Sequence, residues 1–326
     1  METNIDFVVT WVDPTDPKWI KEYNKYSSVP IDENNVRFRD FDLIKYVFRS
    51  IEKFAPWVRK VHFITFGHIP KWMNINHEKI NVVKHTDYIP AEFLPTFNSN
   101  VIEMNLHRLK DLSENFVLFN DDMLFLKRTT PDYFFYNNFP CDSAILDLFV
   151  PTYDCISNIC FNNINLINKY FKMNNIKENL KNWITPVYGH LLIKNLMLIS
   201  LKKISSFEEN HIPHSFKKSI LKEIWDKEEE MLNKVSTNKF RSKEDVNQWL
   251  IRYWQFCENK FYPRKAERHA YRQLDYDINE TCEIIEKQKV TLLCINDSDV
   301  LDFDERVSLL LDSLNKILGE KSAFEK

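Results

Sequence analysis

Residues 5–17, IDFVVTWVDPTDP, decide the fold of this chain. Their apolar part, Ile5–Val12, ends abruptly at aspartate and proline, a pattern that is typical of a buried strand followed by a loop. Three more short apolar runs precede residue 120, at Val61–Phe66, Ile80–Lys84 and Phe116–Phe119. Each has the length and composition of a strand, so we expect four strands in this first part of the chain.

Helical patterns separate these strands. Asp40 is placed to cap a helix whose apolar side chains recur every three or four residues as far as Phe54, where Ala55-Pro56 ends it. Ser99–Leu109 fits a second helix. Strands that alternate with helices in this way predict an α/β, Rossmann-like fold with a mostly parallel sheet.

The second half of the chain has a different character. Helical periodicity is clearest in four segments, Asn163–Lys172, Gly189–Leu201, Ser215–Lys234 and Lys243–Phe256. Val290–Ile295 is again a strand-like apolar run, and Asp304–Leu318 follows it as an amphipathic helix. We therefore expect a single catalytic domain over residues 1–326. Residues 1–150 form its α/β half, residues 151–285 a mainly helical insertion, and residues 286–326 a strand that returns to the sheet and a closing helix.

Composition excludes several classes of protein. The chain has only three glycines, where average usage would give about twenty, so neither a dinucleotide fingerprint nor a phosphate-binding glycine loop can be written. A net charge of −3 argues against a nucleic-acid partner. The six cysteines form no C-x-x-C pair, which indicates reduced thiols and a cytoplasmic location. No apolar run approaches the ~20 residues of a transmembrane segment; peripheral attachment at the inner membrane stays open.

Acidic residues follow two of the expected strands. Asn120-Asp121-Asp122 comes directly after Phe116–Phe119, and Asn296-Asp297 follows the last strand. Open α/β sheets bind ligands at the carboxyl ends of their strands, and Mg²⁺ prefers carboxylate and amide oxygens. Asp13 is a third candidate at the same edge. The alternative is that these residues only form turns, where Asn and Asp are common.

Two arginines precede the first helix. Arg37 and Arg39 are placed to bind an anion, because guanidinium groups suit phosphate oxygens and a helix N-terminus favours negative charge. The equally good alternative is that they pair with Asp40 and Asp42.

Histidine chemistry is suggested at one place. His211 and His214 lie in a proline-containing turn before a helix, where either could act as a general base toward a hydroxyl group. Glu103 and His107 share one helix face at i,i+4, which by itself is explained as a surface pair.

Together these segments resemble the Stealth proteins. These are hexose-1-phosphate transferases that include bacterial capsular-polysaccharide phosphotransferases and the catalytic subunit of the lysosomal-enzyme GlcNAc-1-phosphotransferase. The resemblance covers nearly the whole chain, in four regions of matching order: Ile5–Pro17, Arg37–Lys127, the block HIPHSFKKSILKEIW, and LLCIND.

The resemblance implies the reaction. Such enzymes transfer hexose-1-phosphate from a UDP-sugar, here UDP-GlcNAc or a related UDP-hexose, to a hydroxyl of a glycan or polysaccharide acceptor and release UMP, in capsule or exopolysaccharide synthesis. The implied cofactor is Mg²⁺, with Mn²⁺ or Ca²⁺ as alternatives. An ordinary metal-dependent glycosyltransferase, which would release UDP, is the second hypothesis, and a non-catalytic binding module is a third.

The resemblance also implies roles for individual residues. Asp122 and Asp297, with Asn120 nearby, match metal ligands. Glu103 matches an active-site acid, His211 matches the base with His214 as the alternative, and Arg241 matches an arginine that steadies the phosphate. The residues expected at the nucleotide site are Asp13, Arg37, Arg39 and Asn98. One departure is Pro14, which stands where the family often has glycine and cannot adopt positive φ.

Overall fold

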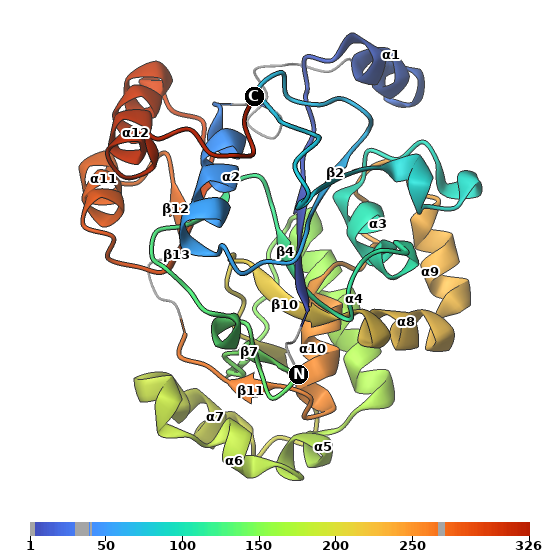
Figure 1. Ribbon diagram of the computed structural model, residues 1–326. Helices are drawn as coiled ribbons and strands as arrows, with labels where there is room; N and C mark the ends of the chain where they lie inside the picture. The colour runs from blue at the N-terminus through green and yellow to red at the C-terminus, as the bar shows by residue number, and fades with distance from the viewer. Residues whose placement is uncertain (1–3, 30–38, 40, 267–270) are drawn as a thin grey trace.

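A five-stranded sheet forms the centre of the molecule. The computed structural model describes residues 4–29, 39, 41–266 and 271–326 (Figure 1). The sheet order is β10-β4-β1-β2-β3, and four of its strands are parallel: β1 (Ile5–Thr10), β2 (Val61–Thr65), β3 (Ile80–Lys84) and β4 (Asn115–Phe119). These are the four strands expected from the apolar runs, and the α/β class with a mostly parallel sheet is confirmed.

Apolar side chains fill both faces of this sheet. Phe7 and Val9 point to one side, against α2 (Leu43–Phe54) and α12 (Phe303–Leu318), whereas Val8 points to the other. Because side chains alternate along a strand, consecutive apolar residues such as Phe7, Val8 and Val9 of β1 require cover on both faces. Helices of the insertion supply the second cover. The final helix begins one residue before its expected start and ends where expected.

The insertion is helical but also contributes an edge strand. Its helices are α4 (Cys155–Tyr170), α5 (Met173–Lys177), α6 (Leu180–Trp183), α7 (Leu192–Leu198), α8 (Lys218–Lys227), α9 (Glu229–Ser236) and α10 (Trp249–Cys257). The predicted helix start at Ser215 is wrong, because β10 (His214–Lys217) pairs antiparallel with β4. The free backbone groups of β4 need partners, and this tertiary demand overrides the helical periodicity of the segment.

The expected last strand exists but belongs to a second sheet. β13 (Leu292–Asn296) lies between β12 (Tyr271–Gln273) and β5 (Met123–Phe125), and it runs antiparallel to β5. The three residues of β5 are buried immediately after the Asn120–Asp122 turn, so their backbone groups require a partner, which β13 provides. The strand therefore returns to the carboxyl end of β4 without joining the five-stranded sheet.

Several elements escaped the sequence patterns. The expected helix at Ser99–Leu109 divides into α3 (Ser99–Met104) and a 3₁₀ turn at Leu106–Arg108. The remaining elements, none of them expected, are α1 (Pro17–Tyr26), α11 (Ile278–Glu286), β6 (Phe135–Tyr136), β7 (Phe139–Asp142), β8 (Leu146–Asp147), β9 (Ser206–Phe207) and β11 (Tyr262–Pro263). All six cysteines are free thiols, as expected. Within the ranges described above, no helix is both long and apolar enough to span a membrane.

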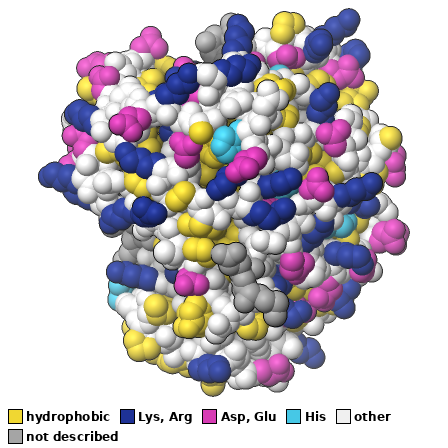
Figure 2. Space-filling model, viewed as in Figure 1, with side chains coloured by type: hydrophobic (Ala, Val, Ile, Leu, Met, Phe, Trp, Pro, Cys, Tyr) yellow, Lys and Arg dark blue, Asp and Glu magenta, His cyan; other side chains and the backbone are white. Residues whose placement is uncertain are grey.

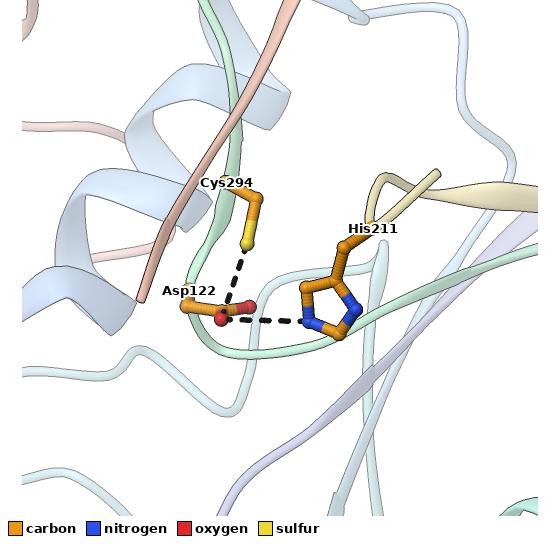
Figure 3. A group of neighbouring side chains, drawn as sticks. All are labelled: Asp122, His211 and Cys294. Carbon is orange, nitrogen blue, oxygen red and sulfur yellow. Dashed lines mark hydrogen bonds and ion pairs between the residues drawn. The ribbon is translucent and has the colours of Figure 1, made fainter. Parts of the chain in front are cut away.

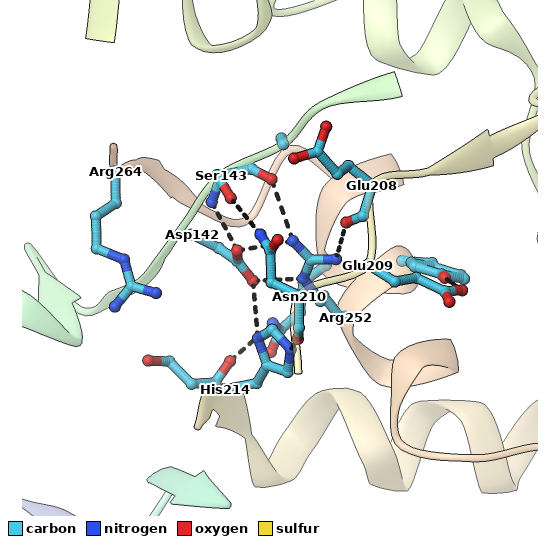
Figure 4. Close-up of polar contacts among 12 residues, drawn as sticks. Asp142, Ser143, Glu208, Glu209, Asn210, His214, Arg252 and Arg264 are labelled. Carbon is cyan, nitrogen blue, oxygen red and sulfur yellow. Dashed lines mark hydrogen bonds and ion pairs between the residues drawn. The ribbon is translucent and has the colours of Figure 1, made fainter. Parts of the chain in front are cut away.

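A buried ion pair joins the insertion to the strands that precede it (Figure 4). The Arg252 guanidinium, on α10, donates to both carboxylate oxygens of Asp142, at 2.8 and 3.0 Å, and to the carbonyl oxygens of Ser143 and Glu208. Arg252 is fully buried. Burial alone would raise the pKa of Asp142, but the charge of Arg252 and the proximity of His214 hold that pKa well below its usual range.

We expect Arg252→Met to lower the free energy of unfolding by about 3–5 kcal/mol, because it leaves the Asp142 charge buried without its partner. Chemical denaturation measures this change. The control is Lys222→Met, which removes one member of an exposed pair with Asp226 and should cost less than about 1 kcal/mol. Equal effects of the two substitutions would contradict this account of the buried pair.

Candidate functional site

A cleft of about 190 Å³ lies at the carboxyl ends of β1 and β4. The residues that follow β1, Trp11 and Val12, form part of its wall, together with apolar and aromatic side chains. Its polar lining comes from Glu103, Asn120, Asp121 and Arg241, together with Thr10, His85, Thr96 and Ser99. Ligands bind at this edge in open α/β sheets. The structure thus brings together three of the residues predicted to act at the site.

Glu103 is a buried acid on α3. Its side chain is only 5% exposed, and burial raises the pKa of Glu103 to about 7, although the charge of Arg241 acts in the opposite direction. A carboxyl group with this pKa exchanges its proton near neutral pH. Such a shift is typical of active-site acids and bases.

Arg241 is an exposed residue whose loop is firmly held. Its guanidinium donates to Ser99 Oγ at 2.8 Å, and the adjoining Asp245 is a buried carboxylate that accepts hydrogen bonds from several sides. The donors are the side-chain amides of Asn98, Asn100 and Asn238 and the backbone N–H of Ser242. The hydrogen bonds of Ser99 and Asp245 therefore hold the Arg241 loop, and with it the positive charge of Arg241, at the cleft.

Asn98 has a different place from the one expected. Its Oδ1 accepts from the backbone N–H of Asn100 and caps α3, and its Nδ2 donates to Asp245 and to the carbonyl oxygen of Phe240. These bonds use its hydrogen-bonding groups within the protein. In this structure Asn98 therefore positions the Arg241 loop, and a contact with the nucleotide stays a prediction.

Asp122, His211 and Cys294 form a second group of donors beside the end of β4 (Figure 3). The Cys294 thiol donates to Asp122 Oδ2 at 3.2 Å, and His211 Nε2 lies 3.9 Å from the same oxygen. Asp122 Oδ1 is buried and has no hydrogen-bond partner. Burial raises the pKa of Asp122, while the nearby His211 acts in the opposite direction.

This group fits a divalent cation that binds mainly through Asp122. One ligand atom from each of the three residues lies within 4.8 Å of the others. Burial, reinforced by the Asp122 charge, raises the pKa of the Cys294 thiol well above its ordinary value. A thiol that stays protonated is a poor ligand, because metals bind the thiolate. The partnerless Oδ1 of Asp122 is the oxygen best placed to bind a cation, and Mg²⁺ commonly takes only one or two protein carboxylates.

Asp297 and Arg39 form an ion pair with each other. Arg39 donates to both carboxylate oxygens of Asp297, at 2.7 and 2.8 Å, and its guanidinium stacks on Phe303. Asp297 also accepts from the backbone N–H of Ser298. Asp297 is therefore not part of the Asp122 group, and the partner that the structure shows for Arg39 is Asp297. Arg37 and Asp40 lie outside the described residues.

The loop after β1 accommodates Pro14 without strain. Asp13 Oδ1 accepts from the backbone N–H and the hydroxyl of Thr15, at 2.9 and 2.6 Å, which closes an Asx turn. Among the described residues, none from 13 to 16 has a positive φ. A glycine is therefore not required here. Asp13 is used within the turn, while its neighbour Val12 lines the cleft.

The two candidate bases face different surroundings, although they are three residues apart. The His211 side chain is 35% exposed and lies beside Asp122. His214 is 2% exposed, its Nε2 lies 2.8 Å from the Asn210 carbonyl oxygen, and its Nδ1 lies 3.6 Å from Asp142. Burial lowers the pKa of His214, so its imidazole is neutral near pH 7. His214 belongs to the buried scaffold shown in Figure 4.

Sequence reasoning missed Cys294 and Asp245 as residues of the site. The spacing of the cysteines carries only a redox signal, but the apolar triplet Met123–Phe125 directly after Asp122 indicates a strand that needs a partner. Pairing with β13 places Cys294 opposite Met123, beside Asp122. No sequence signal distinguishes Asp245 from the other acidic residues of the insertion.

The raised pKa of Glu103 predicts a pH-dependent stability. The folded carboxyl has a pKa of about 7, against an ordinary 4.5, so between these values the folded state keeps a proton that the unfolded state has lost. Stability should therefore fall by up to about 3 kcal/mol as the pH rises through this window. Urea denaturation from pH 4.5 to 8 should show Glu103→Gln losing this slope, whereas the exposed control Glu92→Gln keeps it. Parallel curves for wild type and Glu103→Gln would contradict the shift.

Comparison with known proteins identifies the family of this chain. Three Stealth family models match the chain: conserved region 1 at residues 3–28, conserved region 2 at 37–141 and conserved region 3 at 210–254. Capsular polysaccharide phosphotransferase WcwK of Streptococcus pneumoniae is 43% identical over 331 residues, covering 99% of this chain and 98% of the relative. Exopolysaccharide phosphotransferase cps2G of Lactiplantibacillus plantarum is 37% identical over 330 residues, 99% of this chain and 96% of that one.

Solved structures give a more distant likeness. An active-site mutant of LgtC superposes with a TM-score of 0.40 and 10% identity, over 94% of this chain and 95% of the other. The two relatives above are named phosphotransferases and match this chain over nearly their whole length, so this chain is an enzyme that transfers a phosphate-containing group. At 43% identity over the full chain, with three conserved regions in order, it belongs to the Stealth family.

Proposed function

We propose that the enzyme transfers hexose-1-phosphate from a UDP-sugar to a hydroxyl of a glycan and releases UMP. UDP-GlcNAc or a related UDP-hexose is the proposed donor, and a capsular or exopolysaccharide chain the acceptor. The observation that carries the proposal is the cleft that unites Glu103, Asn120 and Arg241 at the carboxyl ends of β1 and β4, in a chain whose relatives are named polysaccharide phosphotransferases. The proposed location is cytoplasmic.

The proposed reaction is a substitution at the β-phosphorus of the donor. The acceptor oxygen forms a bond to this phosphorus, and the bond from the phosphorus to the oxygen bridging the two phosphates breaks. UMP leaves with the bridging oxygen, and the sugar–phosphate bond stays intact. The proton of the acceptor hydroxyl passes to His211, whose imidazole reaches solvent beside Asp122. In such transfers positioning and neutralisation of charge account for most of the catalysis.

Two further residues act on charge and protons in the cleft. Arg241 would offset the negative charge on the transferred phosphoryl oxygens, from a loop fixed by Ser99 and Asp245. Glu103 lies beside it and has a pKa of about 7 because of burial. We propose that Glu103 assists His211 in proton exchange, since its two protonation states are both populated near neutral pH.

Asp122 is the proposed main ligand of Mg²⁺, with Asn120 as a neighbouring oxygen donor. Mn²⁺ and Ca²⁺ also bind oxygen ligands and are the alternatives. A bound cation would neutralise charge on the donor pyrophosphate and on the departing UMP. Asp297 is a second proposed ligand, which requires that Arg39 and Ser298 release its oxygens. The residues proposed at the nucleotide are Asp13, Arg37, Arg39 and Asn98.

The first test is product analysis with a panel of UDP-sugars, Mg²⁺ and short glycan acceptors. UMP release that depends on acceptor supports the proposal, whereas release of UDP would identify a glycosyltransferase instead. Asp122→Asn should lower UMP release by several orders of magnitude, because the buried oxygen that is free for a cation is lost. Chelator should have the same effect on wild type. Asp226→Asn, on the exposed face of α8, is the control; near-normal turnover of Asp122→Asn would refute its role.

The roles of the two histidines can be distinguished by measuring the turnover and the melting temperature of a variant of each. His211→Gln should lower turnover by about 10²–10⁴-fold, the usual contribution of a general base, and leave the melting temperature unchanged because the side chain is one-third exposed. His214→Gln should lower the melting temperature, because it replaces a buried imidazole between Asn210 and Asp142. If the folded His214→Gln enzyme loses turnover while His211→Gln keeps it, the assignment is reversed.

A further inference from the structure

An unusual helix lies on the surface of the insertion. α7 (Leu192–Leu198) buries a single side chain, the polar Asn195. Its amide donates to the carbonyl oxygens of Ala144 and Trp183, and its Oδ1 accepts from the N–H of Leu146. A surface helix of a globular protein normally turns its apolar side toward the core. In α7 only Leu192 and Leu198 pack, partly buried, against the core, and the Asn195 side chain adds polar bonds to it.

Three of the five apolar residues of α7 point outward. Ile193, Leu196 and Met197 are 61%, 51% and 67% exposed, and their i, i+3, i+4 spacing places them on one face. We call these three residues the α7 stripe. Exposed apolar side chains of the neighbouring turns extend this surface, namely Leu180, Ile184, Val187 and Leu201. In the view shared by Figures 1 and 2, hydrophobic side chains gather at the lower end of the molecule, over α6 and α7.

Lysines greatly outnumber acidic residues in the segment that carries this apolar surface. Residues 155–207 contain seven lysines and a single acidic residue, Glu178. This segment carries +6 within a chain of net charge −3, so the rest of the chain carries −9. Lys181 and Lys203 are exposed. In the part of the chain that the structure describes, no ion pair includes Lys177, Lys181, Lys202 or Lys203.

We propose that the α7 stripe and its lysines dock this enzyme on an anionic lipid bilayer. Apolar side chains of an interfacial helix enter the boundary between headgroups and acyl chains, while nearby lysines are attracted to anionic lipids. The charge argues against a second copy of the chain as occupant. A twofold interface centred on the stripe would bring the lysines of both copies together.

Docking would leave the catalytic cleft accessible. In Figure 1 the start of β1 lies toward the end that carries α6 and α7. The cleft is at the carboxyl ends of β1 and β4, so it lies toward the other end of the parallel strands. A bilayer held by the α7 stripe therefore does not cover the cleft. The inference uses no step of the proposed reaction.

The test is flotation of the full chain with phosphatidylcholine vesicles that contain or lack phosphatidylglycerol. Binding should require phosphatidylglycerol and weaken as salt is raised. Ile193→Ser combined with Met197→Ser should lower the partition coefficient by about tenfold or more, as should Lys202→Glu combined with Lys203→Glu. The matched controls are Ile75→Ser with Leu309→Ser, and Lys71→Glu with Lys110→Glu, at exposed positions elsewhere. Both controls should bind as wild type does.

Two results would overturn the proposal. One is that wild type fails to float with phosphatidylglycerol vesicles, or that the stripe and control variants float equally well. The other is a concentration-dependent dimer in sedimentation velocity that Ile193→Ser with Met197→Ser abolishes, which would assign the stripe to self-association. Circular dichroism melting checks that each variant is folded. UMP release from UDP-sugar in the absence of vesicles is measured separately, so loss of docking is distinguishable from failure of the proposed reaction.

Discussion

The buried pair between Arg252 and Asp142 is the interaction on which the rest of the structure depends. A guanidinium without access to water must find a protein acceptor for its donors, and Arg252 finds them on β7 and on the segment that precedes β10. α10, β7 and the chain around Glu208 are therefore fixed together. His214 completes this cluster and holds the Asn210 carbonyl. His211 is the residue that follows Asn210 in the chain. Its position therefore depends on the Arg252–Asp142 ion pair, although neither member of this pair lines the cleft.

The cleft is lined by side chains where other phosphate-handling enzymes use glycine loops. None of the three glycines lines it, and the loop after β1 turns through the Asp13 side chain instead of a residue with positive φ. Charged groups are then held close to apolar walls, where they lose part of their hydration. The pKa of Glu103 and that of Asp122 both rise because of burial, so the site is assembled at the expense of stability.

Features that depend on neighbours in sequence could be predicted, and features that depend on distant partners could not. The parallel strands and α12 follow from local periodicity, and they lie where expected. β10 could not be recognised, because Ser215 and Phe216 are extended only beside the open edge of β4, about a hundred residues earlier. Arg39 likewise meets Asp297 across 258 positions. Glu103 and Arg241, to which the motif resemblance assigns roles, line one cleft, whereas the difference in burial between His211 and His214 could not be read from the sequence.

The position of β10 in the chain has a consequence for biosynthesis. β4 has no partner on its outer edge until residue 217 has left the ribosome, and the Asp122 turn is not covered until β13 follows at Leu292–Asn296. Chains that end before residue 217 expose the apolar edge of β4, and chains that end before β13 leave β5 without its partner. Such open edges favour association with other unfinished chains. The α/β half of the chain is therefore synthesised first yet completed last. Nonsense mutations that end the chain before β13 should yield aggregated protein instead of a weakened enzyme.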